Sequence, residues 1–257
     1  MRVPPTTIDS VNAELPALAE FGSELRALGW VSDLLVAGSA ATGDYVPGVS
    51  DLDLVAVTDG SVDGDRQATL VELHRRVDRT FGAGLRLGCV YVDVDQREHV
   101  RLAHPTWTHG MLVRRVASAV TRAELVRHGY AVFGRPPQAL FPAMTHQDVR
   151  AAARAELTGY WAWAARRPWM WLDPAIADLG LTSMARGRHA LRTGNLLTKT
   201  QAVEQAAAPA WLVDQLRARR RGAAIASPRR RTAWIAWRDA HRTTRNARAG
   251  TPPGRDR

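Results

Sequence analysis

The sequence is poor in cysteine and lysine and has no long hydrophobic run. Cys89 is the only cysteine among the 257 residues, which excludes a disulfide framework and a cysteine-based zinc site. No apolar stretch approaches the ~18 residues that a membrane-spanning helix needs. Residues Met1–Asp9 also lack the apolar segment of a signal peptide. We therefore expect a cytoplasmic, reduced protein without a membrane partner.

Arginine replaces lysine almost everywhere. Lys199 is the one lysine among 35 basic residues, and the formal net charge is +10 at pH 7. A charge of this sign and size is typical of nucleic-acid-binding proteins. Part of it, however, lies in runs such as Arg219–Arg221 and Arg229–Arg231, and the abundance of arginine and alanine indicates a bias of the whole composition. We favour a solvated surface and do not expect a nucleic-acid partner.

Hydrophobic periodicity predicts an α/β region followed by a helical one. Short apolar runs predict strands at residues 31–37, 52–58 and 85–94, and apolar residues at three- and four-residue spacing predict helices at 10–28 and 66–80. Short helices are predicted at 109–118 and 121–128, a short strand at 130–134, and an interdomain linker in the proline-rich segment 135–142. Further helices are predicted at 146–166, 174–193, 210–220 and 230–240, with another beginning at Thr198.

These elements predict an α+β fold with two domains. The N-terminal domain, residues 1–140, has a mixed sheet with flanking helices. The C-terminal domain, residues 141–242, is an all-α helical bundle, and residues 243–257 form a disordered tail.

One stretch, residues 38–55, combines a small turn with a pair of carboxylates. Gly38-Ser39 follows the first predicted strand, and Asp51 and Asp53 open the second. Side chains alternate along a strand, so the two carboxylates point to the same face. Glycine lets a ligand approach the backbone, and serine offers an N–H and a hydroxyl to a phosphate oxygen. The whole stretch therefore favours a site for a divalent metal and a polyphosphate, whereas either half alone fits an ordinary turn or strand start equally well.

The string Gly38-Ser39, Gly43 and Ser50–Leu54 resembles the signature of the nucleotidyltransferase superfamily typified by DNA polymerase beta. Within it, the chain is most similar to the adenylyltransferases that act on the aminoglycosides streptomycin and spectinomycin. Phe133–Pro142 resembles the domain linker of that group, and Ala185–Lys199 resembles the stretch with which its second domain holds the nucleoside triphosphate. The resemblance implies that the first domain is a nucleotidyltransferase domain and that the second binds nucleotide and substrate.

The resemblance also implies roles for the residues of the first motif. Ser39, next to Gly38, would hold the β- or γ-phosphate of ATP. Asp51 and Asp53 would be the catalytic pair that holds Mg²⁺ against the nucleotide.

Two basic residues of the second domain would reach the phosphates across the nucleotide cleft. The resemblance implies this for Arg186 and Lys199. For Lys199 the residue pattern agrees, because it lies near a predicted helix start, where backbone N–H groups favour anions.

The third strand departs from the family pattern. In these enzymes a glutamate on this strand is the general base, and Gly88 stands at that position here. At ~3.3 Å per residue, Asp93 is ~16 Å further on, and both it and Asp95 have the opposite parity to Gly88. Loss of a general base typically lowers a rate by ~10²–10⁴-fold. Either another group activates the acceptor, or the acceptor differs, or transfer is slow or lost.

Tryptophan and aspartate are concentrated in one part of the helical domain. They could form a wall that stacks on a cationic acceptor and neutralises it, with Trp171, Asp173 and Asp178 as candidate contacts. They could equally be the core of the bundle with an aspartate helix cap, and this interpretation is slightly favoured. The residues are Trp161, Trp163, Trp169, Trp171, Asp173 and Asp178.

Two histidines follow the third predicted strand, in the segment from His104 to His109. With no cysteine or acid beside them, a loop with scattered histidines is favoured over a metal pair. Because the segment follows the third strand, it is a candidate neighbour of the acceptor site.

Together these features predict a Mg²⁺-dependent nucleotidyltransferase that adenylylates a hydroxyl of an aminoglycoside-like small molecule with ATP, an antibiotic-resistance activity. The hydroxyl would attack the α-phosphorus in line and pyrophosphate would leave. The expected partners are a nucleoside triphosphate and a small hydroxyl-bearing acceptor, bound by a monomer. One alternative is a non-catalytic or regulatory nucleotide-binding protein that has lost its general base. Another is nucleotidylation of RNA or protein, which the charge of +10 suggests.

Overall fold

The computed structural model describes residues 16–80, 82, 84–99 and 102–250. The chain divides into two compact units, unit 1 (Met1–Ala143) and unit 2 (Met144–Arg257). The sequence had placed this boundary after residue 140. The helix predicted over residues 10–28 is α2 (Pro16–Ala27), and the part of that prediction before Pro16 lies outside the described residues.

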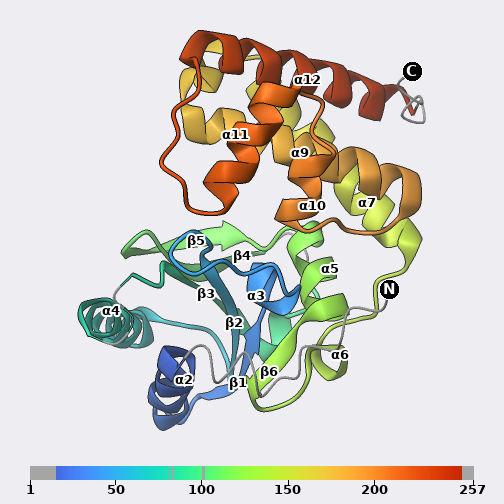
Figure 1. The fold of residues 1–257 in the computed structure, drawn as a ribbon. Coiled ribbons are helices and arrows are strands. Elements are labelled where there is room, and N and C mark those ends of the chain that lie inside the picture. The colour runs from blue at the N-terminus through green and yellow to red at the C-terminus, as the bar shows by residue number, and fades with distance from the viewer. Residues whose placement is uncertain (1–15, 81, 83, 100–101, 251–257) are drawn as a thin grey trace, which may run out of the picture. The chain divides into compact units, whose positions relative to one another are not determined.

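Unit 1 is built on a six-stranded mixed sheet with the strand order β5-β4-β3-β2-β1-β6 (Figure 1). Only β2 and β3 are parallel among its neighbouring pairs, and α4 (Gly64–Arg79) makes the crossover that a parallel pair requires. The strands are β1 (Val31–Val36), β2 (Leu52–Thr58), β3 (Leu87–Asp93), β4 (Ala103–Thr108), β5 (Met111–Val116) and β6 (Tyr130–Phe133).

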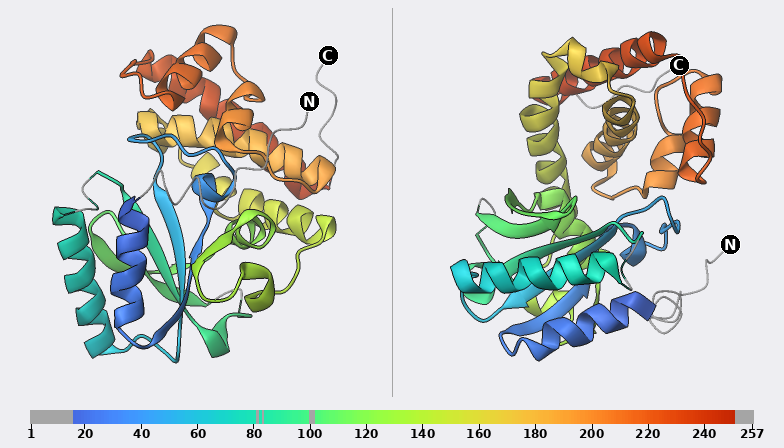
Figure 2. Two further views of the ribbon diagram at one scale, coloured as in Figure 1. Left: turned by 60° about the horizontal axis from the view of Figure 1, so that its bottom comes forward. Right: turned by 90° about the vertical axis from the view of Figure 1, so that its left-hand side faces the viewer.

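Alternation along the strands separates two apolar layers. Leu34 and Leu54 pack with α2 and α4 on one face, whereas Leu35 and Val55 pack with α5 (Ala119–His128) and α6 (Pro137–Leu140) on the other. Figure 2 shows α2 and α4 lying side by side along the sheet. Residues of odd number in β2, Asp53 among them, therefore belong to the face of α5.

The prediction of a helix over residues 109–118 is wrong. Residues 103–116 form an antiparallel hairpin, in which Thr108 of β4 pairs with Met111 of β5. His109 and Gly110 make the two-residue turn, and both have positive φ, 49° and 75°. This is the backbone that a tight hairpin needs, and the proline and threonine residues before it concealed the alternation.

The segment 135–142 is also not a free linker. Pro136-Pro137 begins the short helix α6, consistent with the preference of proline for a first helical turn. Leu140 and Phe141 are buried against the α5 face of the sheet. At its start, Arg135 donates from its guanidinium and its backbone N–H to the buried Asp33. Packing and hydrogen bonds thus attach this segment to unit 1.

Unit 2 is all-helical, as predicted. Its core joins α9 and α12 through residues such as Met184 and Ala236. The 20-residue α9 begins with Asp173 at the N-cap and Pro174 in its first turn, and ends at Gly194 with φ 74°, the pattern expected of helix ends. The elements are α7 (His146–Glu156), η2 (Leu157–Trp161), α8 (Ala162–Ala165), η3 (Pro168–Leu172), α9 (Pro174–Thr193), α10 (Lys199–Glu204), α11 (Ala210–Arg220) and α12 (Arg229–Ala249).

The predicted disordered tail is wrong for its first part. The helix α12 continues to Ala249, because Thr243, Thr244 and Ala247 are buried and extend its apolar side. Residues 251–257 lie outside the described part. No helix in the described ranges is long and apolar enough to cross a membrane.

Candidate active site

A glycine turn brings the end of β1 against β2. The Ala37 N–H donates to the Asp53 carbonyl at 2.8 Å, and the chain then enters the short helix α3 (Gly38–Ala41). Gly38 has φ +58°, and a Cβ there would overlap the Asp53 carboxylate. Only glycine therefore allows this close approach of backbone and carboxylate.

The hydroxyl of Ser39 is buried and has no hydrogen-bond partner among the described residues. Leaving such a group unsatisfied typically costs about 1–3 kcal/mol. The rest of the turn is well bonded, since the Ser39 carbonyl accepts from the Asp44 N–H at 2.9 Å. An anionic oxygen that accepts a hydrogen bond from Ser39 Oγ would satisfy it.

The loop between the turn and β2 is held by its own serine. Ser50 Oγ accepts from the Val46 N–H at 3.0 Å. Tyr45 in the same loop has its pKa raised by burial and by the nearby Asp51 carboxylate. Ser50 thus shapes the loop that carries Asp51 to the start of β2.

Asp51 and Asp53 both line one cavity of about 480 Å³ at the start of β3. Asp51 is exposed, and its carboxylate lies 3.9 Å from the Arg86 guanidinium; Asp53 is half-buried on β2. The other lining residues are Asp78, Gly82, Gly84, Arg86, Leu87, Gly88, Trp107, Thr108, His109 and Gly110.

The donor set fits Mg²⁺ that is shared with a phosphate ligand. Within the described ranges, no three His, Cys, Asp or Glu side chains come together as a metal cluster. Mg²⁺ is commonly bound by one or two carboxylates, with waters and substrate phosphates completing its shell. Asp51 and Asp53 could supply these carboxylates, and the unsatisfied Ser39 hydroxyl could donate to a phosphate oxygen.

Gly88 leaves open the position beside Asp53. The two residues pair in the parallel β2–β3 ladder, and the atom nearest to a Cβ built at Gly88 would be Asp53 Oδ1, at 3.8 Å. A side chain would therefore fit there. Asp93 pairs with Thr58 at the opposite end of the strand and caps the turn at Asp95. Neither acid of that turn replaces the missing carboxylate.

Arg186 and Lys199 are joined through the loop between α9 and α10. Arg186 Nε donates to the Leu197 carbonyl at 3.0 Å, and Leu197 packs with α9 and α10. Thr198 caps α10, so Lys199 is its first residue. The loop between α9 and α10 thus holds both predicted phosphate-binding residues in one part of unit 2.

The structure contradicts the acceptor role of Trp171. This side chain is 1% exposed, and its indole N–H donates to the Ala164 carbonyl. Asp173 accepts from the Ala175 N–H as the cap of α9. Asp178 receives two hydrogen bonds from Arg219, at 2.6 and 2.9 Å. These contacts favour the core-and-cap interpretation of the cluster.

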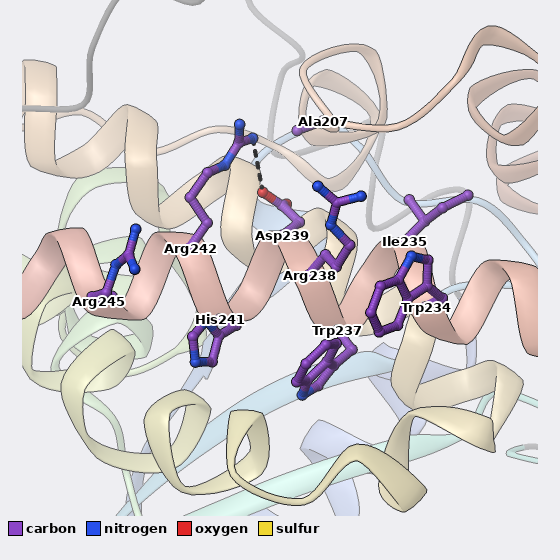
Figure 3. Close-up of a pocket in the computed structure, with 9 residues that line it drawn as sticks. All are labelled: Ala207, Trp234, Ile235, Trp237, Arg238, Asp239, His241, Arg242 and Arg245. Carbon is purple, nitrogen blue, oxygen red and sulfur yellow. Dashed lines mark hydrogen bonds and ion pairs between the residues drawn. The ribbon is translucent and has the colours of Figure 1, made fainter.

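A second cavity, of about 540 Å³, lies along α12 in unit 2. Figure 3 shows that its side chains leave the helix in different directions. Arg242 pairs with Asp239, which also accepts from Arg188, and the Trp237 indole donates to the Ala165 carbonyl. The contacts with Arg188 of α9 and Ala165 of α8 hold α12 to the rest of the unit.

The sequence predicts the segment from His104 to His109 as a neighbour of the acceptor site but does not single out His109, which lines the cavity of Asp51 and Asp53. The signal was present as a His-Gly pair between two strand-forming segments, which is a hairpin-turn pattern. Asp78 and Arg86, which line the same cavity, carried no recognisable pattern.

Comparisons with known proteins agree with this geometry. Residues 18–109 match the model of the nucleotidyltransferase domain family. In fold, the chain is similar to the spectinomycin adenyltransferase AAD(9) from Enterococcus faecialis, whose crystal structure contains ATP and spectinomycin. The TM-score is 0.66 and the identity 14%, over 89% of this chain and 98% of that one. No curated protein sequence matches the chain. The predicted α+β fold is thereby confirmed, the predicted resemblance to a nucleotidyltransferase is confirmed for residues 18–109, and the likeness to the adenyltransferase is one of fold.

Proposed function

We propose that the chain transfers an adenylyl group from ATP to a hydroxyl of an aminoglycoside-like small molecule. The observation that carries the proposal is the Gly38-Ser39 turn with its unsatisfied buried hydroxyl, beside the Asp51 and Asp53 pair. The match of this region to the nucleotidyltransferase domain supports it. The ATP and spectinomycin bound in the similar structure support the choice of donor and acceptor class.

In this proposal Asp51 and Asp53 hold Mg²⁺, and Ser39 donates to a phosphate oxygen. The metal would neutralise charge that develops on the phosphates during transfer. Arg186 and Lys199 would add positive charge for the triphosphate, so Lys199→Gln should weaken the binding of ATP with Mg²⁺ in calorimetry.

The test is pyrophosphate release from ATP and Mg²⁺ with a panel of aminoglycosides that includes spectinomycin and streptomycin. Asp53→Asn keeps the shape of the side chain but removes its charge, and should lower release about 10³-fold, since a catalytic metal contributes several kcal/mol. Asp65→Asn, in the exposed first turn of α4, is the matched control and should leave the rate unchanged. Equal rates in the two variants would contradict the proposal.

A non-catalytic nucleotide-binding protein is the second candidate, favoured by Gly88. It predicts calorimetric binding of ATP with Mg²⁺ but no pyrophosphate release with any acceptor. Gly88→Glu then tests whether the missing carboxylate is the cause, because the position has room for a side chain. Turnover by the unmodified protein would exclude this candidate.

A further inference from the structure

The proposed transfer needs a group that takes the proton of the acceptor hydroxyl, and Gly88 cannot. We infer that His109 is this general base. The inference rests on the proposed function and concerns a residue outside the motif that supports it. The β4–β5 hairpin, where the sequence predicts a helix over residues 109–118, positions His109.

The sheet register brings Thr108 to the open position at Gly88. Asp53 pairs with Gly88 in the parallel ladder. The antiparallel β3–β4 ladder pairs Cys89 with Trp107, which sets Gly88 beside Thr108. The three residues thus form one row across β2, β3 and β4. Neighbouring strands are ~4.8 Å apart, so Thr108 is roughly 10 Å from Asp53.

Thr108 and Asp53 share a face of the sheet. Trp107 packs in the layer of α2 and α4, so its neighbour Thr108 points to the opposite face. Val55 packs in the α5 layer, and Asp53, two residues away, points with it. A glutamate at residue 88 would emerge between them on this same face.

A hydrogen bond holds the His109 ring next to Thr108. The Thr108 hydroxyl and His109 Nδ1 are 2.8 Å apart. In the tautomer in which Nδ1–H donates to the hydroxyl, Nε2 carries the lone pair and can accept a proton. His109 is exposed at the turn and lines the cavity of Asp51 and Asp53. A solvent-accessible imidazole is thereby held beside Thr108, in the cavity that Asp53 and Gly88 also line.

In the step itself, Nε2 takes the hydroxyl proton as the acceptor oxygen bonds to the α-phosphorus. The bond from that phosphorus to the oxygen bridging to the β-phosphate breaks, and pyrophosphate leaves. The imidazolium then releases its proton to water. The charged groups that share the cavity with His109 are Asp51, Asp53, Asp78 and Arg86.

Two other acids are rivals for the role. Asp78 lines the same cavity, but comes from α4, which covers the opposite face. Burial raises its pKa, against the opposing effect of the Trp107 side chain. Glu124 of α5 lines a neighbouring cavity with Asp53 and Gly88, but Asp51 is not among the residues that line it. Of the three, His109 alone lines the Asp51 cavity and is hydrogen-bonded to a residue of the row formed by Asp53, Gly88 and Thr108.

The test uses the full chain with the acceptor on which it is most active. His109→Asn keeps a residue that tolerates positive φ and should lower kcat/KM for the acceptor ~10²–10⁴-fold, with the Kd for ATP and Mg²⁺ unchanged. The fall of kcat/KM at low pH that protonation of a general base produces should disappear. Added imidazole should restore part of the rate of His109→Gly. His128→Asn on α5 is the control and should behave as the unmodified protein does.

The possible failures are distinguishable. If the unmodified protein releases no pyrophosphate with any acceptor, the proposed function fails before His109 is tested. If it turns over and His109→Asn is equally fast, or if Asp78→Asn or Glu124→Gln alone removes the low-pH limb, the inference is overturned. An NMR measurement on the His109 ring needs no turnover, because acceptor can be added without ATP, and saturating acceptor should then displace the ring resonances.

Discussion

The candidate acceptor residues of unit 2 and the candidate phosphate and metal residues of unit 1 differ in their polar contacts. The former have hydrogen-bond or ion-pair partners within their own unit to a greater extent than the latter. In unit 2, Trp171 donates to a carbonyl, Asp173 caps a helix and Asp178 pairs with an arginine. In unit 1, the Ser39 hydroxyl is buried without a partner in the described part of the chain. Among the described residues, Asp51 makes one long ion pair, 3.9 Å, with Arg86. Residues that stabilise a fold use up their hydrogen bonds, whereas a binding site keeps some for its ligand.

The difference predicts that Trp171 is needed for stability. Trp171→Ala should lower the free energy of unfolding by about 3–5 kcal/mol, because a buried indole leaves a cavity. A Cβ at Gly180 would already overlap this ring, so the site is tightly packed. Trp169→Ala is the matched control: it lies in the same turn, η3, but is 64% exposed. It should change stability by no more than about 0.5 kcal/mol.

Urea denaturation of both variants measures these effects, and acceptor KM provides the second readout. A large rise in the acceptor KM of Trp171→Ala, measured where the variant is fully folded, would show that Trp171 contributes to acceptor binding. It would contradict the contrast between the two units. A large rise for Trp169→Ala instead would assign that role to the exposed tryptophan.

His74 shows that an unsatisfied buried atom is not by itself a site. Its Nδ1 has no partner in the described residues, but Trp107 stacks on the ring with centroids 4.6 Å apart. Nε2 lies 2.7 Å from the Tyr91 hydroxyl. The His74 ring is enclosed by the apolar core on the α4 face of the sheet. Ser39, in contrast, follows Gly38, which lines the cavity that Asp53 and Gly88 also line. Burial lowers the pKa of His74 from 6.5 to about 3.

This pKa makes the stability of unit 1 depend on pH. Between pH 6.5 and 3 the unfolded chain binds a proton at His74 that the folded chain does not, so the free energy of unfolding falls as the pH falls. By pH 4.5 the loss from this residue should be about 2–3 kcal/mol. Urea denaturation at pH 7 and 4.5 measures it. In the double variant His74→Phe/Tyr91→Phe, the fall in the free energy of unfolding between pH 7 and 4.5 should be smaller by this amount. An equal fall in the variant and the unmodified protein would show that His74 is not its cause.

Local sequence patterns were enough to predict that the Gly38 turn and Asp53 lie close together. Gly38 and Asp53 are linked by one turn and one strand pair, so the sequence spacing alone indicates that they meet. The role of Gly88 came from the family resemblance, and the β2–β3 ladder pairs it with Asp53. The segment that ends at His109 was predicted near the acceptor site, but the two-residue turn that carries His109 was not, because a helix was predicted there.

Long-range packing accounts for the other errors. The number of tryptophans in residues 161–171 does not say which of them point inward. The arginine-rich end of α12 has a polar sequence, but its buried side is set by the helices against which it packs. Pro136-Pro137 has the composition of a linker, and the apolar residues that follow it decide that the segment packs on the sheet.

The finest test of the comparison sets two serines of unit 1 against each other. Ser118 Oγ accepts from the Thr121 N–H as the cap of α5, so Ser118→Ala should cost about 1 kcal/mol of stability without changing ATP binding. Ser39→Ala removes a hydroxyl that gains nothing in the folded chain, and should leave stability unchanged or raise it by up to about 1 kcal/mol.

The same Ser39→Ala change should weaken ATP binding about tenfold or more, because a hydrogen bond to a charged group is worth about 1.5–3 kcal/mol. Denaturation and calorimetry on the two variants give both quantities. If Ser39→Ala destabilises the protein as much as Ser118→Ala and leaves the Kd for ATP unchanged, Ser39 belongs to the scaffold. The unsatisfied hydroxyl would then no longer mark Ser39 as part of a binding site.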